Sequence, residues 1–180
     1  GLPQASTYAV LDGDLTITQN VNQGNYIHGL ELSYYQQFAF LPEPFHTLAM
    51  SASFVNLDGD IRIQNPFVGG STNTVRMPGL VENTLQAALF WEYKNLRSQL
   101  GFRHESEKNG SMVNGSVITF DPATYIDLSF AFRFLGGLDA YLTIENLSDE
   151  QVIGYYDKKI KVASVQEFGR SYHLGLQYRF

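Results

Sequence analysis

Apolar and polar side chains alternate along most of the chain, and the alternation runs longest at residues 167–180. Its apolar positions are Phe168, Tyr172, Leu174, Leu176, Tyr178 and Phe180, and its small or polar positions are Gly169, Ser171, His173, Gly175, Gln177 and Arg179. A period of two predicts a β-strand whose faces meet different surroundings. Strands of globular domains usually contain about 5–6 residues, whereas a membrane-spanning strand needs about 9–11. The stretch therefore predicts a membrane-spanning strand, with an edge strand of a soluble β-sandwich as the alternative.

The same alternation recurs upstream and predicts an antiparallel all-β sheet of about eight strands in total. The further strands are expected at residues 14–19, 26–38, 48–54, 83–93, 96–103, 125–134 and 138–145. Pro42 and Pro44 end the second of these because proline cannot donate to a strand ladder, and Gly136-Gly137 is typical of a tight hairpin.

Short and long connections alternate between these strands. The strand at 48–54 is expected to dissolve at residues 56–60, and long polar loops are expected from there to Asn83, from 105 to 122 and from 146 to 166. Transmembrane barrels have short periplasmic turns and long external loops, and aromatic side chains gather where the strands meet the lipid headgroups. Trp91 and Tyr93 lie at such a strand end. A sandwich gives no reason for this segregation of loops.

Composition restricts the function without deciding it. The hydrophobic fraction of 44% and the mean hydropathy of -0.15 suit a soluble domain. They also suit a membrane barrel, because the hydropathies of its alternating lipid-facing and water-facing residues cancel in the average. The absence of cysteine is compatible with an oxidising envelope compartment. A net charge of -6 without a basic stripe argues against a nucleic-acid partner. Because no charged-then-apolar leader opens the chain, either a signal was removed or the sequence is a fragment.

Several motifs carry a family resemblance. The most specific are Asn146-Leu-Ser-Asp-Glu150 and Phe168-Gly-Arg-Ser-Tyr172, followed by Phe180. Further motifs are Asn22 with Gly29-Leu-Glu31, Met77-Pro-Gly79 with Asn83, and Tyr125-Ile-Asp-Leu-Ser129. Together they resemble the C-terminal third of a TonB-dependent outer-membrane receptor. The pattern of His173, Gly175, Tyr178 and Phe180 resembles the C-terminal signal read by the barrel assembly machinery.

The resemblance implies a 22-stranded transmembrane barrel in the bacterial outer membrane, plugged by an N-terminal domain through which TonB drives uptake. The chain itself carries no plug and no TonB-contact segment, so it is expected to form wall and extracellular loops of an importer for a siderophore, vitamin, carbohydrate or similar solute. The alternative is a complete eight-stranded barrel with a structural or adhesive role. We expect an incomplete barrel, with no full ladder between residues 14–19 and the terminal strand.

The faces predict which side chains meet lipid. In the strand at 125–134, Leu128, Phe130 and Phe132 are expected to face lipid, and the alternate positions water. Charged positions that must point inward, because each Arg at the bilayer midplane costs about 2–4 kcal/mol, are Glu31, Glu92, Arg97, Arg103, Asp127, Arg133, Asp139 and Glu145. A structural network among these charges is the favoured interpretation, and a ligand path is the alternative.

Candidate ligand contacts lie in the loops and the lumen. They are Arg62, Arg76, Arg103, Tyr155, Tyr156 and Lys158, with Lys159 and Lys161 as further loop cations. The four histidines lack metal-ligand spacing and no activated nucleophile is recognisable, so we expect neither an enzyme nor a cofactor. Asp58-Gly-Asp60 lacks the further oxygen ligands of a calcium loop.

Overall fold

The chain is all-β, and its strands form two antiparallel sheets. The computed structural model describes residues 25–64, 72–113, 116–156, 159 and 161–179. The strands are β1 (Tyr26–Gln37), β2 (Ala49–Gln64), β3 (Thr72–Arg76), β4 (Asn83–Tyr93), β5 (Leu96–Glu105), β6 (Lys108–Val113), β7 (Ser116–Phe120), β8 (Ala123–Arg133), β9 (Leu138–Glu145), β10 (Gln151–Tyr156), β11 (Val162–Glu167) and β12 (Ser171–Tyr178), with one 3-10 turn at Phe45–Thr47. No helix in the described ranges is long and apolar enough to cross a membrane.

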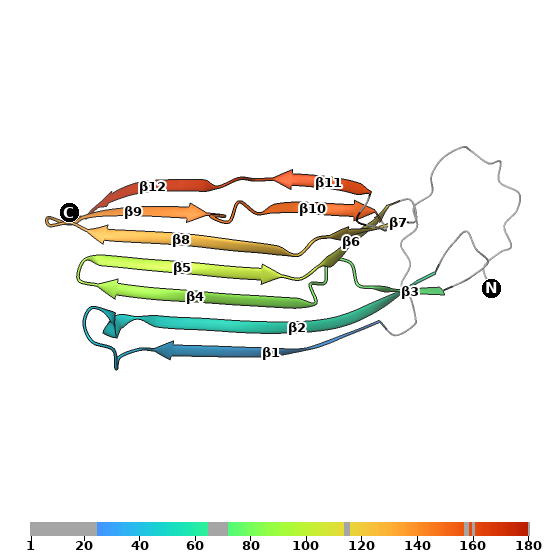
Figure 1. Cartoon of the computed structure of the whole chain (residues 1–180), viewed down its shortest axis with the longest axis horizontal. Coiled ribbons are helices and arrows are strands. Elements are labelled where there is room, and N and C mark those ends of the chain that lie inside the picture. Colours follow the sequence, from blue (N-terminus) through green and yellow to red (C-terminus); the bar gives the residue numbers. More distant parts are fainter. Residues whose placement is uncertain (1–24, 65–71, 114–115, 157–158, 160, 180) are drawn as a thin grey trace, which may run out of the picture.

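The main sheet has the order β1-β2-β4-β5-β8-β9-β12, with β3 paired to β2 (Figure 1). The β1–β2, β4–β5 and β8–β9 connections lie together at one end, here called the short-turn end, and the longer connections lie at the opposite, far end. The segregation of connections is therefore confirmed for the described strands. Gly136 and Gly137 have φ values of 83° and 81°, which confirms the tight hairpin that their sequence predicts.

The register confirms the predicted faces within the observed strands. The terminal strand is shorter than the predicted 167–180: β12 covers Ser171–Tyr178, because the chain turns between β11 and β12 at Gly169, whose φ is 68°. One row across the sheet consists of Met50, Leu89, Leu100, Leu128, Ile144 and Tyr172. The adjacent row on the opposite face consists of Ala49, Phe90, Gln99, Ser129, Thr143 and His173. We call these the apolar face and the polar face.

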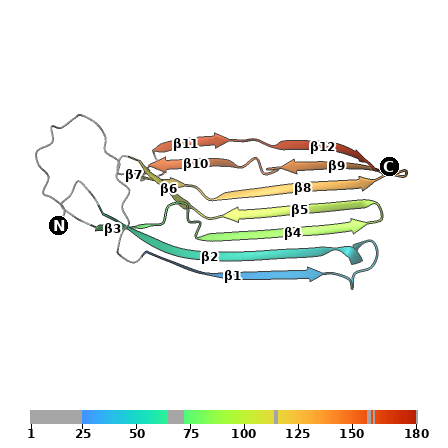
Figure 2. The ribbon, with the colours of Figure 1, turned by 180° about the vertical axis from the view of Figure 1, so that it is seen from behind.

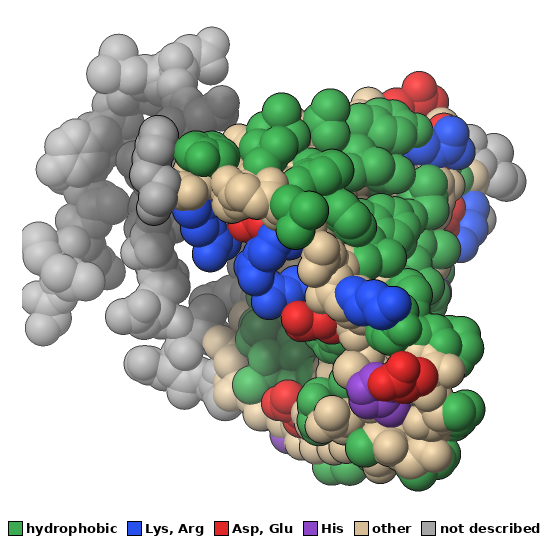
Figure 3. Space-filling view, turned by 90° about the vertical axis from the view of Figure 1, so that its left-hand side faces the viewer, with side chains coloured by type: hydrophobic (Ala, Val, Ile, Leu, Met, Phe, Trp, Pro, Cys, Tyr) green, Lys and Arg blue, Asp and Glu red, His purple; other side chains and the backbone are tan. Residues whose placement is uncertain are grey.

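The main sheet is a single layer whose apolar face is uncovered. Among the described residues, the buried hydrophobic side chains are Ala49, Leu80 and Ala123 only, whereas Leu32 is 57% and Leu174 80% exposed. Strands contact mainly their ladder neighbours, and no second sheet is stacked on either face in this part of the chain. A domain in water normally buries one face of its sheet on another layer. Viewed from the short-turn end, hydrophobic side chains cover most of one side of the arched sheet (Figure 3).

The expectation that the strand starting near residue 48 dissolves at residues 56–60 is wrong. β2 continues to Gln64 and pairs with β1 as far as Asp60. The apolar positions change face here, because Val55, Leu57 and Ile61 lie on the face opposite Phe54. If the alternation of the preceding residues is continued unchanged through this stretch, the positions expected on the apolar face are polar. The stretch then looks like a loop although it is a strand.

The expectation of long loops without strands is also wrong. The connection after β5 contains the β6–β7 hairpin, and the connection after β9 contains the β10–β11 hairpin. β10 pairs with β7, so the two connections build one four-stranded sheet of order β11-β10-β7-β6 at the far end (Figure 2). Pairing between connections satisfies backbone groups that a structureless loop would leave to water.

The described strands of the main sheet remain open, with β1 and β12 at opposite edges. Residues 14–19 and Asn22 lie outside the described ranges. The expected absence of a ladder between residues 14–19 and the terminal strand therefore stays a prediction.

Candidate functional site

The two most specific motifs interlock where β9 gives way to β10 and β11 to β12. The Asn146 side-chain amide donates hydrogen bonds to the carbonyl oxygens of Gly169 at 3.0 Å and Glu150 at 3.2 Å. Its Oδ1 accepts from the Glu150 amide at 2.9 Å and from Ser148 Oγ at 3.3 Å. The Asn146 side chain therefore links the β9–β10 connection to the β11–β12 connection.

Arg170 strengthens the same junction from the other motif. Its Nε donates to the Leu147 carbonyl oxygen at 3.0 Å, and its Nη2 lies 3.7 Å from Asp149 Oδ2. Asn146 has a φ of 55°, and its backbone amide donates to Asp127 Oδ1 at 2.9 Å. Asparagine tolerates this left-handed conformation better than most residues, which explains its place at this turn.

A second junction links β9 and β12 on the polar face. Gly175 is the cross-strand partner of Tyr141, and the Tyr141 ring occupies the space where a Gly175 side chain would be. A Cβ at Gly175 would overlap Cζ, Cε2 and the hydroxyl of Tyr141. Sequence reasoning missed this contact. The usable signal was a glycine within a strand, which often marks close approach of another group.

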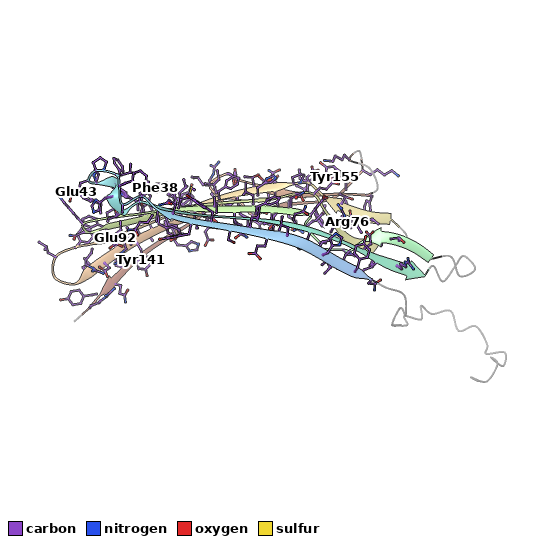
Figure 4. All side chains as sticks on the ribbon, turned by 90° about the horizontal axis from the view of Figure 1, so that it is seen from below. Phe38, Glu43, Arg76, Glu92, Tyr141 and Tyr155 are labelled. Atoms are coloured by element: carbon purple, nitrogen blue, oxygen red, sulfur yellow. The ribbon has the colours of Figure 1, made fainter. Side chains whose placement is uncertain are left out.

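Ion pairs gather on the polar face at the short-turn end. Arg97 Nε lies 3.2 Å from Glu92 Oε1, while Asp139 is paired with Arg133 Nε at 3.1 Å and with Arg179 Nη2 at 3.0 Å. Glu92 and Tyr141 lie on the side of the sheet opposite Phe38 and Glu43 (Figure 4). The register confirms that these charges share one face, and their predicted inward position stays a prediction.

Two neighbouring hollows adjoin these pairs. The larger, of about 410 Å³, is lined by Phe90, Gln99, Ser129, Tyr141 and Thr143 among others. The smaller, of about 200 Å³, lies nearer the turns, and both include Glu92, Arg97, Ala131 and Tyr141 in their walls.

The predicted ligand contacts do not form one site. Arg76 lies near the far end with Tyr155 (Figure 4), where it pairs with Glu82 at 2.7 Å and Asp58 at 3.5 Å. The hydrogen bond that Arg76 donates to the Glu82 carboxylate raises the pKa of the Arg76 guanidinium. Arg62 and Arg76 belong to the face that carries Phe54, whereas Arg103 lies on the polar face. Residues predicted together are therefore divided between opposite faces.

Arg103 and Tyr155 interact with neighbouring charged or aromatic side chains, whereas the contact of Tyr156 is made by its backbone. Arg103 pairs with Glu105 at 2.8 Å, and its guanidinium carbon lies 4.6 Å from the centre of the Tyr125 ring. Burial and the neighbouring Asp121 raise the pKa of the Tyr155 hydroxyl. Tyr156 donates its backbone amide to the Lys161 carbonyl oxygen at 2.8 Å, and Lys158 lies outside the described residues.

Lys159 connects the two hairpins of the four-stranded sheet. Its Nζ lies 2.7 Å from Asp121 Oδ1 and 3.6 Å from Glu107 Oε2. The hydrogen bond with Asp121 raises the pKa of the Lys159 ammonium. The cation therefore stabilises a contact between connections that are distant in sequence.

The predicted assembly residues lie on both faces of β12. His173 Nε2 lies 3.6 Å from Glu145 Oε2 on the polar face, which also carries Gly175. Tyr178 lies on the apolar face, and Phe180 is outside the described residues.

Metal-binding geometry is absent from the described ranges, where no group of three or more His, Asp or Glu side chains could hold a metal ion. No protein-family model matches the chain, and neither a curated protein nor a solved structure matches it.

Proposed function

We propose that this chain is a wall segment of a wide transmembrane β-barrel, in a TonB-dependent outer-membrane receptor that imports a scarce solute such as a siderophore, vitamin or carbohydrate. The observation that carries the proposal is the uncovered apolar face of a single-layer sheet. A protein in water does not leave such a continuous band exposed, whereas a lipid bilayer covers it.

The lengths of two strands and the aromatic side chains at the short-turn end support a position of the sheet in a membrane. β4 and β8 each contain 11 residues, which matches the about 9–11 that a spanning strand needs. At the short-turn end, Trp91 stacks on Phe45 and Tyr93 with ring centres 6.2 and 6.3 Å apart, and its Nε1 donates to the Pro44 carbonyl oxygen at 2.9 Å. Amphipathic rings favour the headgroup region.

The open edges support a segment of a larger barrel. β1 and β12 end the described main sheet without joining each other. An unpaired strand edge is not stable in lipid, so other strands must continue the sheet on both sides. A complete eight-stranded barrel requires closure, and a β-sandwich requires a second sheet stacked on the first. The described strands have neither arrangement.

The receptor assignment depends on the resemblance of the motifs, and the junction made by Asn146 and Arg170 supplies a structural reason for them. Both motifs meet in one hydrogen-bonded turn between the spanning hairpin and the far-end sheet. Such a junction would hold an extracellular extension on a membrane wall, where contact with solute takes place in this class of receptor.

Uptake measurements test the transport role. The complete reading frame that encodes this chain would be expressed in a Gram-negative host, and uptake of labelled siderophores, cobalamin and oligosaccharides would be compared in cells with and without TonB. The proposal predicts accumulation of one of these solutes only when TonB is active. Location of the protein outside the outer-membrane fraction, or uptake that is independent of TonB, would contradict it.

A further inference from the structure

We propose that the larger hollow on the polar face binds an uncharged saccharide, so that the solute imported by the receptor is a carbohydrate. The inference depends on the proposed function, because only a barrel turns this face toward the path of a solute. It deepens that function by selecting one chemical class of solute and by assigning residues of the wall to its binding.

The hollow is built on four adjacent strands of the main sheet, β4, β5, β8 and β9. It lies over two consecutive rows of the polar face, the second nearer the short-turn end. The first row consists of Phe90, Gln99, Ser129 and Thr143, and the second of Glu92, Arg97, Ala131 and Tyr141. The volume of about 410 Å³ falls within the range of about 300–1,000 Å³ that is usual for small-molecule sites.

Two aromatic rings flank a floor of small side chains. Phe90 of β4 and Tyr141 of β9 are 37% and 45% exposed, and β8 contributes Ser129 and Ala131 between them. Three strand spacings of about 4.8 Å separate β4 from β9, which places the two strands about 14 Å apart. The Tyr141 ring is held in position because it lies against the backbone of Gly175. The C–H groups on the face of a sugar ring pack on exposed aromatic rings of this kind.

Neutral hydrogen-bonding groups lie in the same hollow. Within the described residues, the side chains of Gln99, Ser129 and Thr143 make no hydrogen bond to the protein. The amide and the two hydroxyls offer donors as well as acceptors. A sugar hydroxyl also donates and accepts, so a saccharide can use both kinds of group.

The charges of this hollow cancel. Among the described residues that line it, the charged ones are Glu92 and Arg97, and their side chains pair with each other at 3.2 Å. Glu92 lies on the same side of the sheet as Tyr141 (Figure 4). A negatively charged metal–siderophore complex would be attracted by surplus cations, which this hollow lacks. Paired charges, exposed rings and neutral polar groups favour an uncharged solute rich in hydroxyl groups.

Binding of neutral sugars to the complete receptor tests the site. The product of the whole reading frame that contains this chain would be purified from outer membranes in detergent. Isothermal titration calorimetry would measure its binding of oligosaccharides of glucose, mannose, xylose and N-acetylglucosamine. One of these sugars should bind with a Kd that does not change as salt is added, because the ligand carries no charge.

Substitutions in the hollow then locate the binding. Phe90→Ala should raise Kd by about tenfold, because it removes a ring on which the sugar packs, and Thr143→Ala should raise it by about fivefold. Tyr125→Ala is the matched aromatic control, since Tyr125 lies on the polar face of β8 outside the hollow, and it should leave Kd unaltered.

A side chain that fills the hollow provides a second test. Ser129→Phe places a ring on the floor and should abolish binding, while the amount of receptor in the outer membrane shows that the variant is assembled. If it is not assembled, Phe90→Ala and Thr143→Ala still decide the site. No binding of any of the four sugars, or sugar binding that these changes leave unaltered, would overturn the proposal.

The transport role can fail separately from this inference, because sugar binding is measured without TonB. Uptake that is independent of TonB would contradict the transport role alone. TonB-dependent uptake of a siderophore, by a receptor that binds none of the sugars, would contradict the saccharide site alone.

Discussion

The ring of Tyr141 lies against the backbone of Gly175 on the neighbouring strand, in the space that any larger residue at 175 would need. The contact joins β9 to β12 on the polar face, beside the hollows. It also gives Gly175 a packing role in addition to the one that the C-terminal signal implies.

Gly175→Val should therefore displace Tyr141 and destabilise the β9–β12 pair by about 1–3 kcal/mol, the usual cost of overpacking. Urea unfolding in detergent micelles, followed by tyrosine fluorescence, would measure the change. Gly101→Val is the matched control, because a Cβ there would lie at an ordinary 3.8 Å from Asp127. Equal effects at the two glycines would show that Tyr141 is not responsible.

Asn146→Ala should lower the free energy of unfolding by about 1–3 kcal/mol, because it removes the hydrogen bonds to Gly169, Glu150 and Ser148. Asn146→Asp keeps the acceptor for the Glu150 amide but loses both donations, so its effect should also be clear. Thr143→Ala, a nearby change on the polar face outside this junction, serves as the control. A loss at Asn146 no larger than at Thr143 would argue against a structural junction.

The pH dependence of Lys159 follows from its partner. Asp121 raises the pKa of the Lys159 ammonium above its ordinary 10.5, so the ion pair contributes its full stability below about pH 10.5 and loses it as pH rises through the higher folded-state pKa. Titration of the lysine ¹³Cε resonance by NMR would give this pKa. In Asp121→Asn it should move back toward the ordinary value, and an unchanged titration would contradict the pairing.

A charge on the apolar face should be far more costly than the same charge on the polar face. Phe130→Arg should destabilise the membrane-inserted protein by about 2–4 kcal/mol, whereas Ser129→Arg on the opposite face should have little effect. Refolding yield and urea midpoints in lipid vesicles would compare the pair. Similar losses for both variants would indicate that neither face meets lipid.

The strands of the main sheet were predictable because their alternation is local: the register places Leu100, Leu128 and Ile144 on one face, as their sequence positions require. The far-end strands were not, since β10 finds its partner β7 in another connection. The predicted strand at residues 48–54 is shorter than β2, because the apolar positions of β2 change face between Phe54 and Val55.

The candidate ligand site was less predictable than the fold. Arg76 was predicted as a ligand contact in a loop and Arg103 as one in the lumen, but the register places them on opposite faces of the sheet, and each has a carboxylate partner. The smaller hollow has Arg133, Asp139 and Arg179 in its walls, and these three residues come together only because β8, β9 and β12 are adjacent in the sheet. Motif residues such as Asn146 were recognised by their resemblance to a family pattern. Their hydrogen-bond partners could not be predicted from the sequence, because the contact between the two motifs is seen only in the folded structure.

The most direct test of the membrane assignment is the environment of consecutive positions along β8. Single cysteines at residues 127 to 132, each carrying a nitroxide spin label in lipid vesicles, would be compared for collision with oxygen, which concentrates in lipid, and with a water-soluble nickel chelate. A membrane wall predicts oxygen accessibility at Leu128, Phe130 and Phe132, and nickel accessibility at Asp127, Ser129 and Ala131, with a period of two. Protection of Phe130 from both reagents would mean that protein covers the apolar face, and would contradict the account.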